Sequence, residues 1–399
     1  MEFDPYSREF FEDPWEMYRW LREEAPCYHN EQIGFWAVSR YDDCVEVHRD
    51  TATYTSTRGV SLDQLRSAAF SGLAAEGASV IMMDPPDHEK MRKLVNRAFT
   101  PRRIAEWEPV VQSVIGGFLD DLAGAGTFDA VRDISGPFPV EVICEILGVP
   151  SVDRQQIRHW TDGMLEREIG NPFPTDSGIA GAIAMQEYFL ALVADRRQHP
   201  TDLMIDHLIA AEVERGDGST ERLDDKEVVQ FVILLAAAGS ETVTKLVGNG
   251  VMTFAEHPDE CRRLQAEPEL AGSAVEEVLR WKAPSQYQGR FSLADRSFHG
   301  QTIPADQPVL IVTGAANRDP RAYDNPDRFD IGRHATPLGI SFGHGIHYCI
   351  GAHLARLEGK IAFTEIYRRW PDLKVDLDGV QFVHMANVAG PSSVPVTAC

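Results

Sequence analysis

Hydrophobic positions recur with a helical period over much of the chain, and shorter apolar runs lie between the periodic segments. An amphipathic helix is predicted near the N-terminus, where Trp15, Tyr18 and Leu21 share one face. Two short runs rich in aromatic and β-branched residues follow, and they predict the strands of a hairpin at 27–28 and 34–38. The pattern therefore favours a mainly α protein with small β-sheets (α+β).

The longest periodic segment runs from about Asp225 to Glu256 and predicts one helix of roughly 48 Å, at about 1.5 Å per residue. Its middle reads Ala236-Ala237-Ala238-Gly239-Ser240-Glu241-Thr242. Small residues allow a planar ligand to lie against the backbone, whereas an acid beside a hydroxyl is unusual in an apolar helix centre. Burying Glu241 there is costly unless its carboxyl group is hydrogen-bonded or functional. A helix kink with a solvated glutamate is the alternative.

Composition and charge narrow the class of protein. No Pro/Ser/Gly-rich linker or charge block divides the 399 residues, so 1–399 is expected to form a single domain. Lys plus Arg number 38 against 61 Asp plus Glu, and the net charge of −23 argues against nucleic acid or an anionic membrane as the main partner. The first residues lack the pattern of a signal peptide, and the longest apolar run, Phe231 to Gly239, is about half of a bilayer span. The six cysteines are scattered, so reduced thiols in a cytoplasmic protein are expected.

A glycine-punctuated loop near the C-terminus delivers one cysteine to the start of an apolar helix. It reads Phe342-Gly343-His344-Gly345-Ile346-His347-Tyr348-Cys349-Ile350-Gly351. The glycines allow positive φ or a close approach of the backbone to a flat ligand. The N–H groups of a helix start lower the pKa of Cys349 and favour the thiolate that binds metal. A buried structural cysteine is one alternative, and a zinc site using His344, His347 and Cys349 is another, although such a site would call for a second ligand pair.

The pattern Phe-Gly-x-Gly-x-His-x-Cys-x-Gly resembles the haem-binding signature of the cytochrome P-450 monooxygenases, in their soluble bacterial form. The resemblance implies the cytochrome P-450 fold, with haem b (iron protoporphyrin IX) between the long helix and the helix that follows the cysteine loop. It makes Cys349 the axial ligand of the haem iron, and an axial thiolate favours O–O cleavage. It also implies that Phe342, Gly343 and Gly351 contact the haem.

The same resemblance assigns roles along the long helix. Thr242 would hold oxygen and Glu241 would relay protons, while Ala238 and Gly239 would border the haem. Thr242 can also bond back to the carbonyl of Ala238, which loosens the helix at that point. Two positions depart from the residues that are frequent in the family, namely Ser240 and Val243.

Four basic residues would hold the haem propionates by the same resemblance: His88, Arg92, Arg290 and His347. His88 and Arg92 are four residues apart, which places both on one face of a helix that starts near Asp87. Taken without the resemblance, the pair fits a solvated basic face and Arg290 fits a solvated strand residue.

An acid and an arginine three residues apart, Glu277 and Arg280, lie on a predicted helix that ends before Pro284. The spacing alone fits an ordinary surface ion pair. The resemblance adds Arg328, which would complete a buried Glu-Arg-Arg network around the cysteine loop. Truncating one member of such a network would leave a buried charge unpaired.

The function implied is that of a monomeric haem-thiolate monooxygenase, which uses O2 and two supplied electrons to hydroxylate or epoxidise an apolar small molecule. No flavin or iron–sulfur motif is recognisable in the sequence, so the electrons are expected from a ferredoxin and a ferredoxin reductase that uses NAD(P)H. Basic residues in segments on the thiolate side are expected to dock the ferredoxin: Lys93, Arg97, Arg102, Arg103 and Arg356. A peroxide-driven haem-thiolate peroxygenase and a non-catalytic haem sensor are the alternatives.

Substrate identity stays open, with terpenoid, steroid, fatty acid, polyketide and aromatic molecules all compatible. The segment 51–80 is rich in Ser, Thr, Gly and Ala without a firm period, which predicts a long loop, and such loops are usually functional. The positions expected to face the substrate are 56–80, 165–184, Leu235, Ala238, 286–288 and 388–391.

Overall fold

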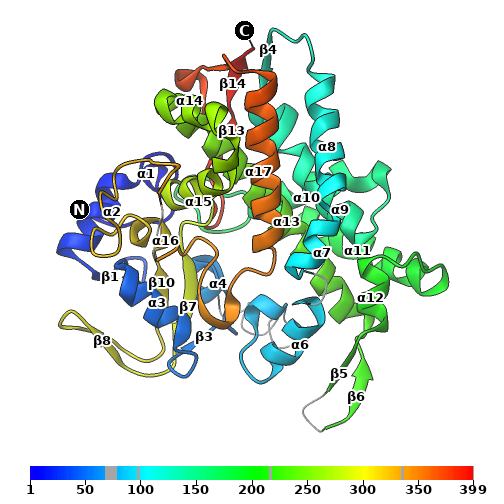
Figure 1. Ribbon diagram of the computed structural model, residues 1–399. Coiled ribbons are helices and arrows are strands. Elements are labelled where there is room, and N and C mark those ends of the chain that lie inside the picture. The colour runs from blue at the N-terminus through cyan, green and yellow to red at the C-terminus, as the bar shows by residue number, and fades with distance from the viewer. Residues whose placement is uncertain (68–78, 97–98, 215–217, 334–336, 399) are drawn as a thin grey trace.

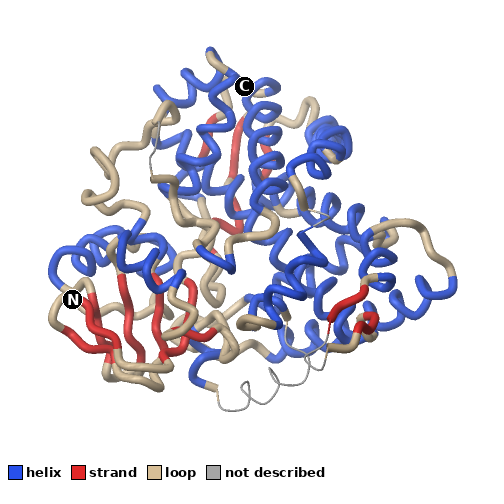
Figure 2. Tube along the Cα trace, turned by 60° about the horizontal axis from the view of Figure 1, so that its bottom comes forward, coloured by secondary structure: helices blue, strands red, loops and turns tan. Residues whose placement is uncertain are grey.

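The computed structural model describes residues 1–67, 79–96, 99–214, 218–333 and 337–398. Helices form the larger part of the molecule, and the largest sheet lies to one side of them (Figure 2). The predicted fold class, mainly α with small sheets, is confirmed.

The long helix α13 spans Asp225–Glu256, as the periodicity predicts. Its start is fixed by a capping box, because Asp224 accepts a hydrogen bond from the Glu227 N–H at 2.8 Å and Glu227 accepts one from the Asp224 N–H at 2.9 Å. Figure 1 shows α13 behind α17, the helix that follows the cysteine loop. The elements that pack against α13 include α9, α10, α11, α15 and α17.

The remaining helices are short or of medium length. The α-helices are α1 (Arg8–Glu12), α2 (Trp15–Glu24), α3 (Tyr41–Arg49), α4 (Leu62–Arg66), α6 (Asp87–Asn96), α7 (Pro101–Glu106), α8 (Glu108–Asp121), α9 (Pro137–Leu147), α10 (Arg154–Leu165), α11 (Asp176–Gln198), α12 (Met204–Ala210), α14 (Pro258–Ala266), α15 (Ala271–Trp281), α16 (Thr313–Ala316) and α17 (Ala352–Arg369). The single-turn and irregular helices are η2 (Val80–Met82), η3 (Ala130–Ser135), η4 (Ser151–Asp153), η5 (Pro268–Leu270), η6 (Gly345–His347) and η7 (Leu377–Gly379).

The largest sheet has five strands in the order β1-β2-β10-β7-β3. Strands β2 and β10 are parallel, and the other neighbours are antiparallel. The predicted hairpin is confirmed as β1 and β2, with Cys27 opposite Val38. The strands are β1 (Cys27–Asn30), β2 (Phe35–Val38), β3 (Tyr54–Thr55), β4 (Thr127–Asp129), β5 (Glu212–Glu214), β6 (Thr220–Arg222), β7 (Gln288–Ser292), β8 (Arg296–Phe298), β9 (Gln301–Ile303), β10 (Pro308–Ile311), β11 (Lys374–Val375), β12 (Gln381–Phe382), β13 (Pro391–Ser393) and β14 (Pro395–Thr397).

The prediction of a structureless loop over 51–80 is wrong in part. β3 pairs with β7 at the edge of the largest sheet. A capping box, in which the Gln64 side chain accepts from the Ser61 N–H, stabilises the N-terminus of α4. Hydrogen bonds to distant residues stabilise this segment, whose own sequence has no regular period. The residues 68–78 of the predicted loop lie outside the described chain.

The N-terminal segment builds a core of its own with residues from the last third of the chain. Phe3, Phe10 and Tyr18 pack with Tyr287 and Leu310, all of them buried. At the edge of this core the guanidinium of Arg318 lies between two indole rings, 3.6 Å from the Trp15 centroid and 3.5 Å from the Trp281 centroid. The stack ties α2 to α15 and to the segment after α16.

Two of the described helices, α11 and α13, are long and apolar enough to cross a membrane by length and composition alone. In the most apolar window of α13, 67% of the residues are buried inside the protein, as in the core helix of a globular domain. The corresponding share for α11 is 28%, and Ile179 and Ile183 are half-exposed there.

Candidate active site

The cysteine loop lies directly on the end of α3. Gly343 and Gly345 have φ values of +72° and +70°, a region that glycine adopts without strain. A Cβ atom at Gly345 would lie 2.8 Å from the carbonyl oxygen of His48, so the loop packs there against backbone. The loop is closed by a hydrogen bond of 2.9 Å from the Cys349 N–H to the Phe342 carbonyl.

The Cys349 thiol lies just before the N-terminus of α17, three residues ahead of Ala352. Cys349 is exposed in this structure, yet the protein atoms crowded around its sulfur raise the pKa of the thiol, whereas the N–H groups of Gly351 and Ala352 and the charges of Arg92 and Arg356 lower it. The surrounding protein has the largest effect, so the free thiol is favoured. A cation bound at the sulfur would reverse this balance, because metal ligation deprotonates cysteine.

The zinc alternative gains no support from this geometry. Among the residues that the structure describes, no three or more His, Cys, Asp or Glu side chains are arranged to hold a metal ion. A metal bound by Cys349 would therefore have to bring its remaining ligands with it, as the iron of a haem does.

The four predicted propionate ligands converge from two separate elements, the helix α6 and the strand β7, and from the cysteine loop. The rings of His88 on α6 and His347 on η6 lie 4.3 Å apart between centroids. Arg290 on β7 is buried, and its guanidinium donates to the Gly289 carbonyl at 2.7 Å. Arg92 donates to the Tyr348 carbonyl. Burial and the neighbouring positive charges, Arg290 foremost, lower the pKa of His347 to about 2.

This cluster has the character of an anion site. Both ring nitrogens of His88 are buried without a hydrogen-bond partner, although buried polar atoms are nearly always paired. Burial lowers the pKa of Arg290 to about 10, and only Asp84 acts on it in the opposite sense. Unpartnered ring nitrogens beside the buried guanidinium of Arg290 and the half-buried guanidinium of Arg92 fit carboxylate groups such as the haem propionates. The residues present thus fit a haem whose iron lies at Cys349.

The middle of α13 exposes small residues on one side. Ala238 is exposed and Thr242 is half-exposed, while the residues from 243 to 250 are buried. The Thr242 hydroxyl donates to the Ala238 carbonyl at 2.7 Å, as predicted. A Cβ atom at Gly239 would point at α9, 3.2 Å from Ile143 Cγ1. This glycine allows α13 to pack on α9, and its predicted place beside the haem stays a prediction.

Glu241 is buried on another side of α13 from Thr242, since neighbouring residues on a helix are about 100° apart. Its carboxylate lies 2.6 Å from the Lys245 ammonium, one turn along the helix. Lys245 also donates to the Pro391 carbonyl at 3.0 Å. The third ionisable group is Asp162 on α10, whose pKa is raised to about 7 by burial and by the carboxylate of Glu241, to which it is hydrogen-bonded.

These three side chains line a cavity of about 280 Å³ between α10, α13 and the C-terminal strands. The acid and the alcohol that were predicted to act together therefore face different spaces. A route between Glu241 and Thr242 requires the Glu241 side chain to leave Lys245.

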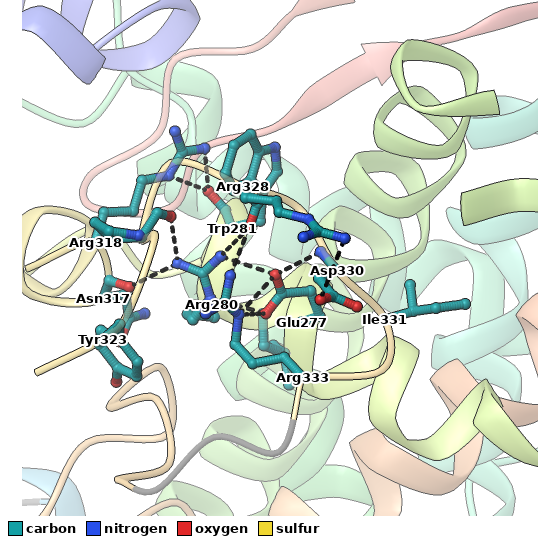
Figure 3. A network of polar contacts seen from close by, with 12 residues as sticks. Glu277, Arg280, Trp281, Asn317, Arg318, Tyr323, Arg328, Asp330, Ile331 and Arg333 are labelled. Atoms are coloured by element: carbon teal, nitrogen blue, oxygen red, sulfur yellow. Dashed lines mark hydrogen bonds and ion pairs between the residues drawn. The ribbon is translucent and has the colours of Figure 1, made fainter. Parts of the chain in front are cut away.

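The Glu-Arg-Arg network is present with a different third member (Figure 3). Glu277 and Arg280 form two hydrogen bonds of 2.8 Å each, both buried. The predicted partner Arg328 is wrong, because its side chain is 66% exposed and lies 3.8 Å from Asp330. Arg333 takes its place, with Nε 3.2 Å from the Glu277 carboxylate. Arg328 contributes its backbone carbonyl, which accepts from Arg280 and Arg333.

Several residues of this region were not predicted from the sequence: His48, Asp162, Lys245, Arg318 and Arg333. Lys245 alone carried a local signal, since it follows Glu241 by four residues on a predicted helix. The others reach the site from separate segments, and no spacing along the chain connects them.

Comparison with known proteins agrees with this geometry. The protein family described as Cytochrome P450 matches residues 184–378. The chain is 40% identical over 394 residues to a putative cytochrome P450 123 of Mycobacterium tuberculosis, covering 99% of this chain and 96% of the relative. It is 37% identical to a vitamin D(3) 25-hydroxylase of Pseudonocardia autotrophica over 404 residues, with the same coverage.

Solved structures show the same likeness. The crystal structure of CYP109E1 from Bacillus megaterium in complex with testosterone superposes with a TM-score of 0.86 at 31% identity, covering 97% of this chain and 98% of that one. Identity at this level over nearly the whole chain establishes the family. The chain belongs to the cytochrome P450 family of haem b monooxygenases.

Proposed function

We propose that this cytochrome P450 hydroxylates or epoxidises an apolar small molecule with electrons delivered by a ferredoxin and its NAD(P)H-dependent reductase. One oxygen atom of O2 enters a C–H or C=C bond of the substrate, and the other leaves as water with two electrons and two protons. The observation that carries the proposal is the Cys349 thiol at the start of α17, next to a buried anion site. Haem b bound there supplies the activation of dioxygen.

The proposed roles of the chain follow from where each side chain lies. Cys349 provides the thiolate, which the N–H groups of Gly351 and Ala352 stabilise by hydrogen bonds. His88, Arg92, Arg290 and His347 hold the propionates and thereby orient the ring. Phe342 and Gly343 form part of the loop wall below it, where Arg356 lies 4.5 Å over the Phe342 ring.

Thr242 is proposed to help hold oxygen through a hydrogen bond, and Glu241 to supply protons to it. The Thr242 hydroxyl donates its one proton to the Ala238 carbonyl, so its oxygen can accept a hydrogen bond. Glu241 has access to a polar cavity in which Asp162 has a pKa of about 7. A carboxyl group of that pKa exchanges protons readily near neutral pH.

The substrate is proposed to be a medium-sized apolar molecule with the bulk of a steroid. The exposed surface of α13 at Ala238 and Thr242 is small and largely apolar, and it offers few groups that could bind a charged ligand. One relative acts on vitamin D(3), and a similar structure contains testosterone. Titration of the haem absorbance with testosterone and with palmitate tests this class, and a spectral shift with palmitate alone would contradict it.

We further propose that the ferredoxin docks beside α7. Arg102 and Arg103 are exposed, and their only charged neighbour in the described chain is Glu106. Lys93 is exposed on α6, whereas Arg356 is half-buried against Glu276 and Tyr348. Arg97 lies outside the described residues.

The same proposal covers the state of the protein in the cell. Residues 1–399 act as one domain, and the protein is a cytoplasmic monomer. The net charge of −23 supports the monomer, because like charges on two copies repel.

The central test is a carbon monoxide difference spectrum of the dithionite-reduced protein, with C349A and C44A as matched variants. Cys44 is a buried cysteine on α3 whose thiol donates to the Val38 carbonyl at 3.4 Å. The wild type and C44A should give the red-shifted Soret band of thiolate ligation, and C349A should not. An unshifted band in the wild type, or a shifted band that persists in C349A, would contradict the proposal.

A peroxide-driven reaction is the second candidate, and one observation favours it. Glu241 is paired with Lys245 rather than aimed at Thr242, and peroxide chemistry needs no such relay. Product formation from peroxide is therefore compared with product formation from O2, NADH and the ferredoxin pair. The monooxygenase proposal requires more product from O2, NADH and the ferredoxin pair than from peroxide at equal haem concentration.

A further inference from the structure

His48 is a buried titratable side chain that the roles above leave unused. It lies on the last turn of α3, next to the cysteine loop, and its exposure is 3%. Neither of its ring nitrogens has a hydrogen-bond partner in the described structure. A buried imidazole always carries at least one N–H, so this donor needs an acceptor.

The neighbours of His48 belong to the anion site. A Cβ atom at Gly343 would lie 3.7 Å from His48 Cε1, so the ring borders the haem-binding loop. Burial lowers the pKa of His48, and the positive charge of Arg290 lowers it further, as does His344. His48 in turn acts on the pKa of His347. The ring is thus neutral and close to two of the proposed propionate ligands.

The protein groups around His48 are already engaged. Gln288 lies close enough to raise the pKa of His48 as a hydrogen-bond partner, but no hydrogen bond of normal length and angle joins the two side chains. Gln288 instead accepts from the Thr313 hydroxyl at 2.6 Å and donates to the Ser285 hydroxyl at 2.8 Å. Arg290 and Arg49 are donors only. His344 accepts from Arg49, with 3.3 Å between Nδ1 and Arg49 Nε. None of these neighbours accepts a hydrogen bond of normal length and angle from His48.

We propose that His48 is a fifth residue of the anion site, and that its ring N–H donates a hydrogen bond to the haem propionate held by Arg290. This inference rests on the proposed propionate site. It extends that site across the cysteine loop to α3, so that the helix on which the loop packs also binds the cofactor. His48 then positions the haem and takes no part in the chemistry at the iron.

The test measures how fast the purified holoprotein loses haem to an excess of apomyoglobin. The variants are H48L, H48Q, R290Q and H384L, each prepared with haem bound. Removing a hydrogen bond to a charged group should accelerate haem loss on the order of tenfold in H48L. H48Q keeps an N–H donor and should stay within about threefold of the wild type.

H384L is the matched control, since His384 is a partly buried imidazole that contacts Phe11 and lies 3.8 Å from Glu12, away from the anion site. It should release haem at the wild-type rate. R290Q separates the two claims. Fast loss in R290Q together with wild-type loss in H48L overturns the role of His48 and keeps the propionate site, whereas wild-type loss in both overturns the site itself.

The reduction potential gives a readout that a purely structural role would not move. Without the His48 N–H the propionate keeps more of its negative charge near the iron, so the potential of H48L should fall below that of the wild type and of H48Q. If H48L does not accumulate as holoprotein, H48M replaces it, because the flexible methionine side chain fills irregular core space. A reduction potential of H48L, or of H48M in its place, that equals the potential of H384L overturns the inference.

Discussion

Asp162, Glu241 and Lys245 lie close together in the cavity beside α13, which Glu166, Arg132 and Arg158 also line. Lys245 neutralises one negative charge, and its shortest ion pair is with Glu241 at 2.6 Å. Arg158 and Lys245 lower the pKa of Asp162, but burial and Glu241 have the larger effect and raise it from 3.8 to about 7. Near neutral pH the pair of carboxyl groups therefore holds a proton within the fold.

This proton makes stability depend on pH in a defined direction. Because the folded pKa of Asp162 lies above the unfolded value, the folded state binds the proton more tightly, and this contribution is lost as pH rises from about 4 to about 7. The difference in stability between D162N and the wild type should therefore grow in favour of D162N as pH rises from about 4 to about 7. Above about pH 7 this difference should stay constant. Thermal unfolding at pH 4.5, 6 and 8 checks this, with the exposed Glu166 of the same cavity changed in E166Q as control. A difference between D162N and wild type that stays constant with pH would contradict it.

The Glu277 network supplies a second comparison of single residues. Arg333 is mostly buried and donates to Glu277 and to three backbone carbonyls, whereas the Arg328 side chain is largely solvated. R333A should lower the free energy of unfolding by about 2–3 kcal/mol, because it leaves buried acceptors unpaired. R328A should change it by no more than about 0.5 kcal/mol. The midpoints of urea unfolding show which of the two variants is less stable. Equal destabilisation by R333A and R328A would contradict the role of Arg333 as the third member of the network.

Among single residues, the sequence predicted those functional residues that lie close to one another in one short segment. Cys349 with its glycines, and Glu277 with Arg280, are separated by fixed numbers of residues. Arg333 took the place of Arg328 because the segment after Phe329 turns back toward α15, with the Asp330 N–H donating to Glu277 at 2.9 Å. A turn of that kind has no signal in residue spacing.

Among the elements, the cysteine loop has the strictest backbone requirement. Gly343 and Gly345 both have φ near +70°, so alanine at either position is strained. Gly345 has the additional constraint of the His48 carbonyl 2.8 Å from its Cβ position, whereas the nearest atom to that of Gly343 is 3.7 Å away.

The two glycines thus form a matched pair of variants. G345A should purify with a lower ratio of haem to protein than G343A, since it also displaces the loop from α3. The ratio of Soret to protein absorbance measures this directly. Equal ratios would mean that φ strain alone matters and that the packing of the loop on α3 is dispensable.

Helices and strands were predicted correctly where one hydrophobic period extends over many residues. They were not predicted where an element forms only by pairing with residues far away in the sequence. The bounds of α13 follow from a 32-residue periodicity and a capping box. By contrast, β3 has two residues and exists because β7, more than 230 positions later, bonds to it. The order of the five-stranded sheet was equally out of reach, since β10 inserts between β2 and β7.

Over the whole molecule, acidic residues outnumber basic ones, so exposed basic residues on one face stand out against a negative background. An acidic ferredoxin would be repelled by most of this surface and attracted beside α7, where Arg102 is 93% and Arg103 is 62% exposed. Orientation during encounter is then set by long-range charge.

Two charge-reversal double variants that change the net charge of the protein by the same amount test this docking surface. R102E/R103E should slow reduction by the ferredoxin on the order of tenfold at low salt, and the difference should shrink at high salt. R8E/R19E, two exposed arginines of α1 and α2, is the control with the same change of net charge. Stopped-flow reduction at two ionic strengths provides the rates, and equal slowing by both doubles would contradict a localised dock.

The stack of Trp15, Arg318 and Trp281 also bears on how the chain is made. Its first member leaves the ribosome roughly 300 residues before Arg318, an interval on the order of 15 to 60 s at about 5–20 residues per second. During that time Phe3, Phe10 and Tyr18 have no Tyr287 or Leu310 to pack against. The nascent chain therefore carries an aromatic, unshielded leading end through most of its synthesis, and its yield in a foreign host depends on chaperones that bind early and release late.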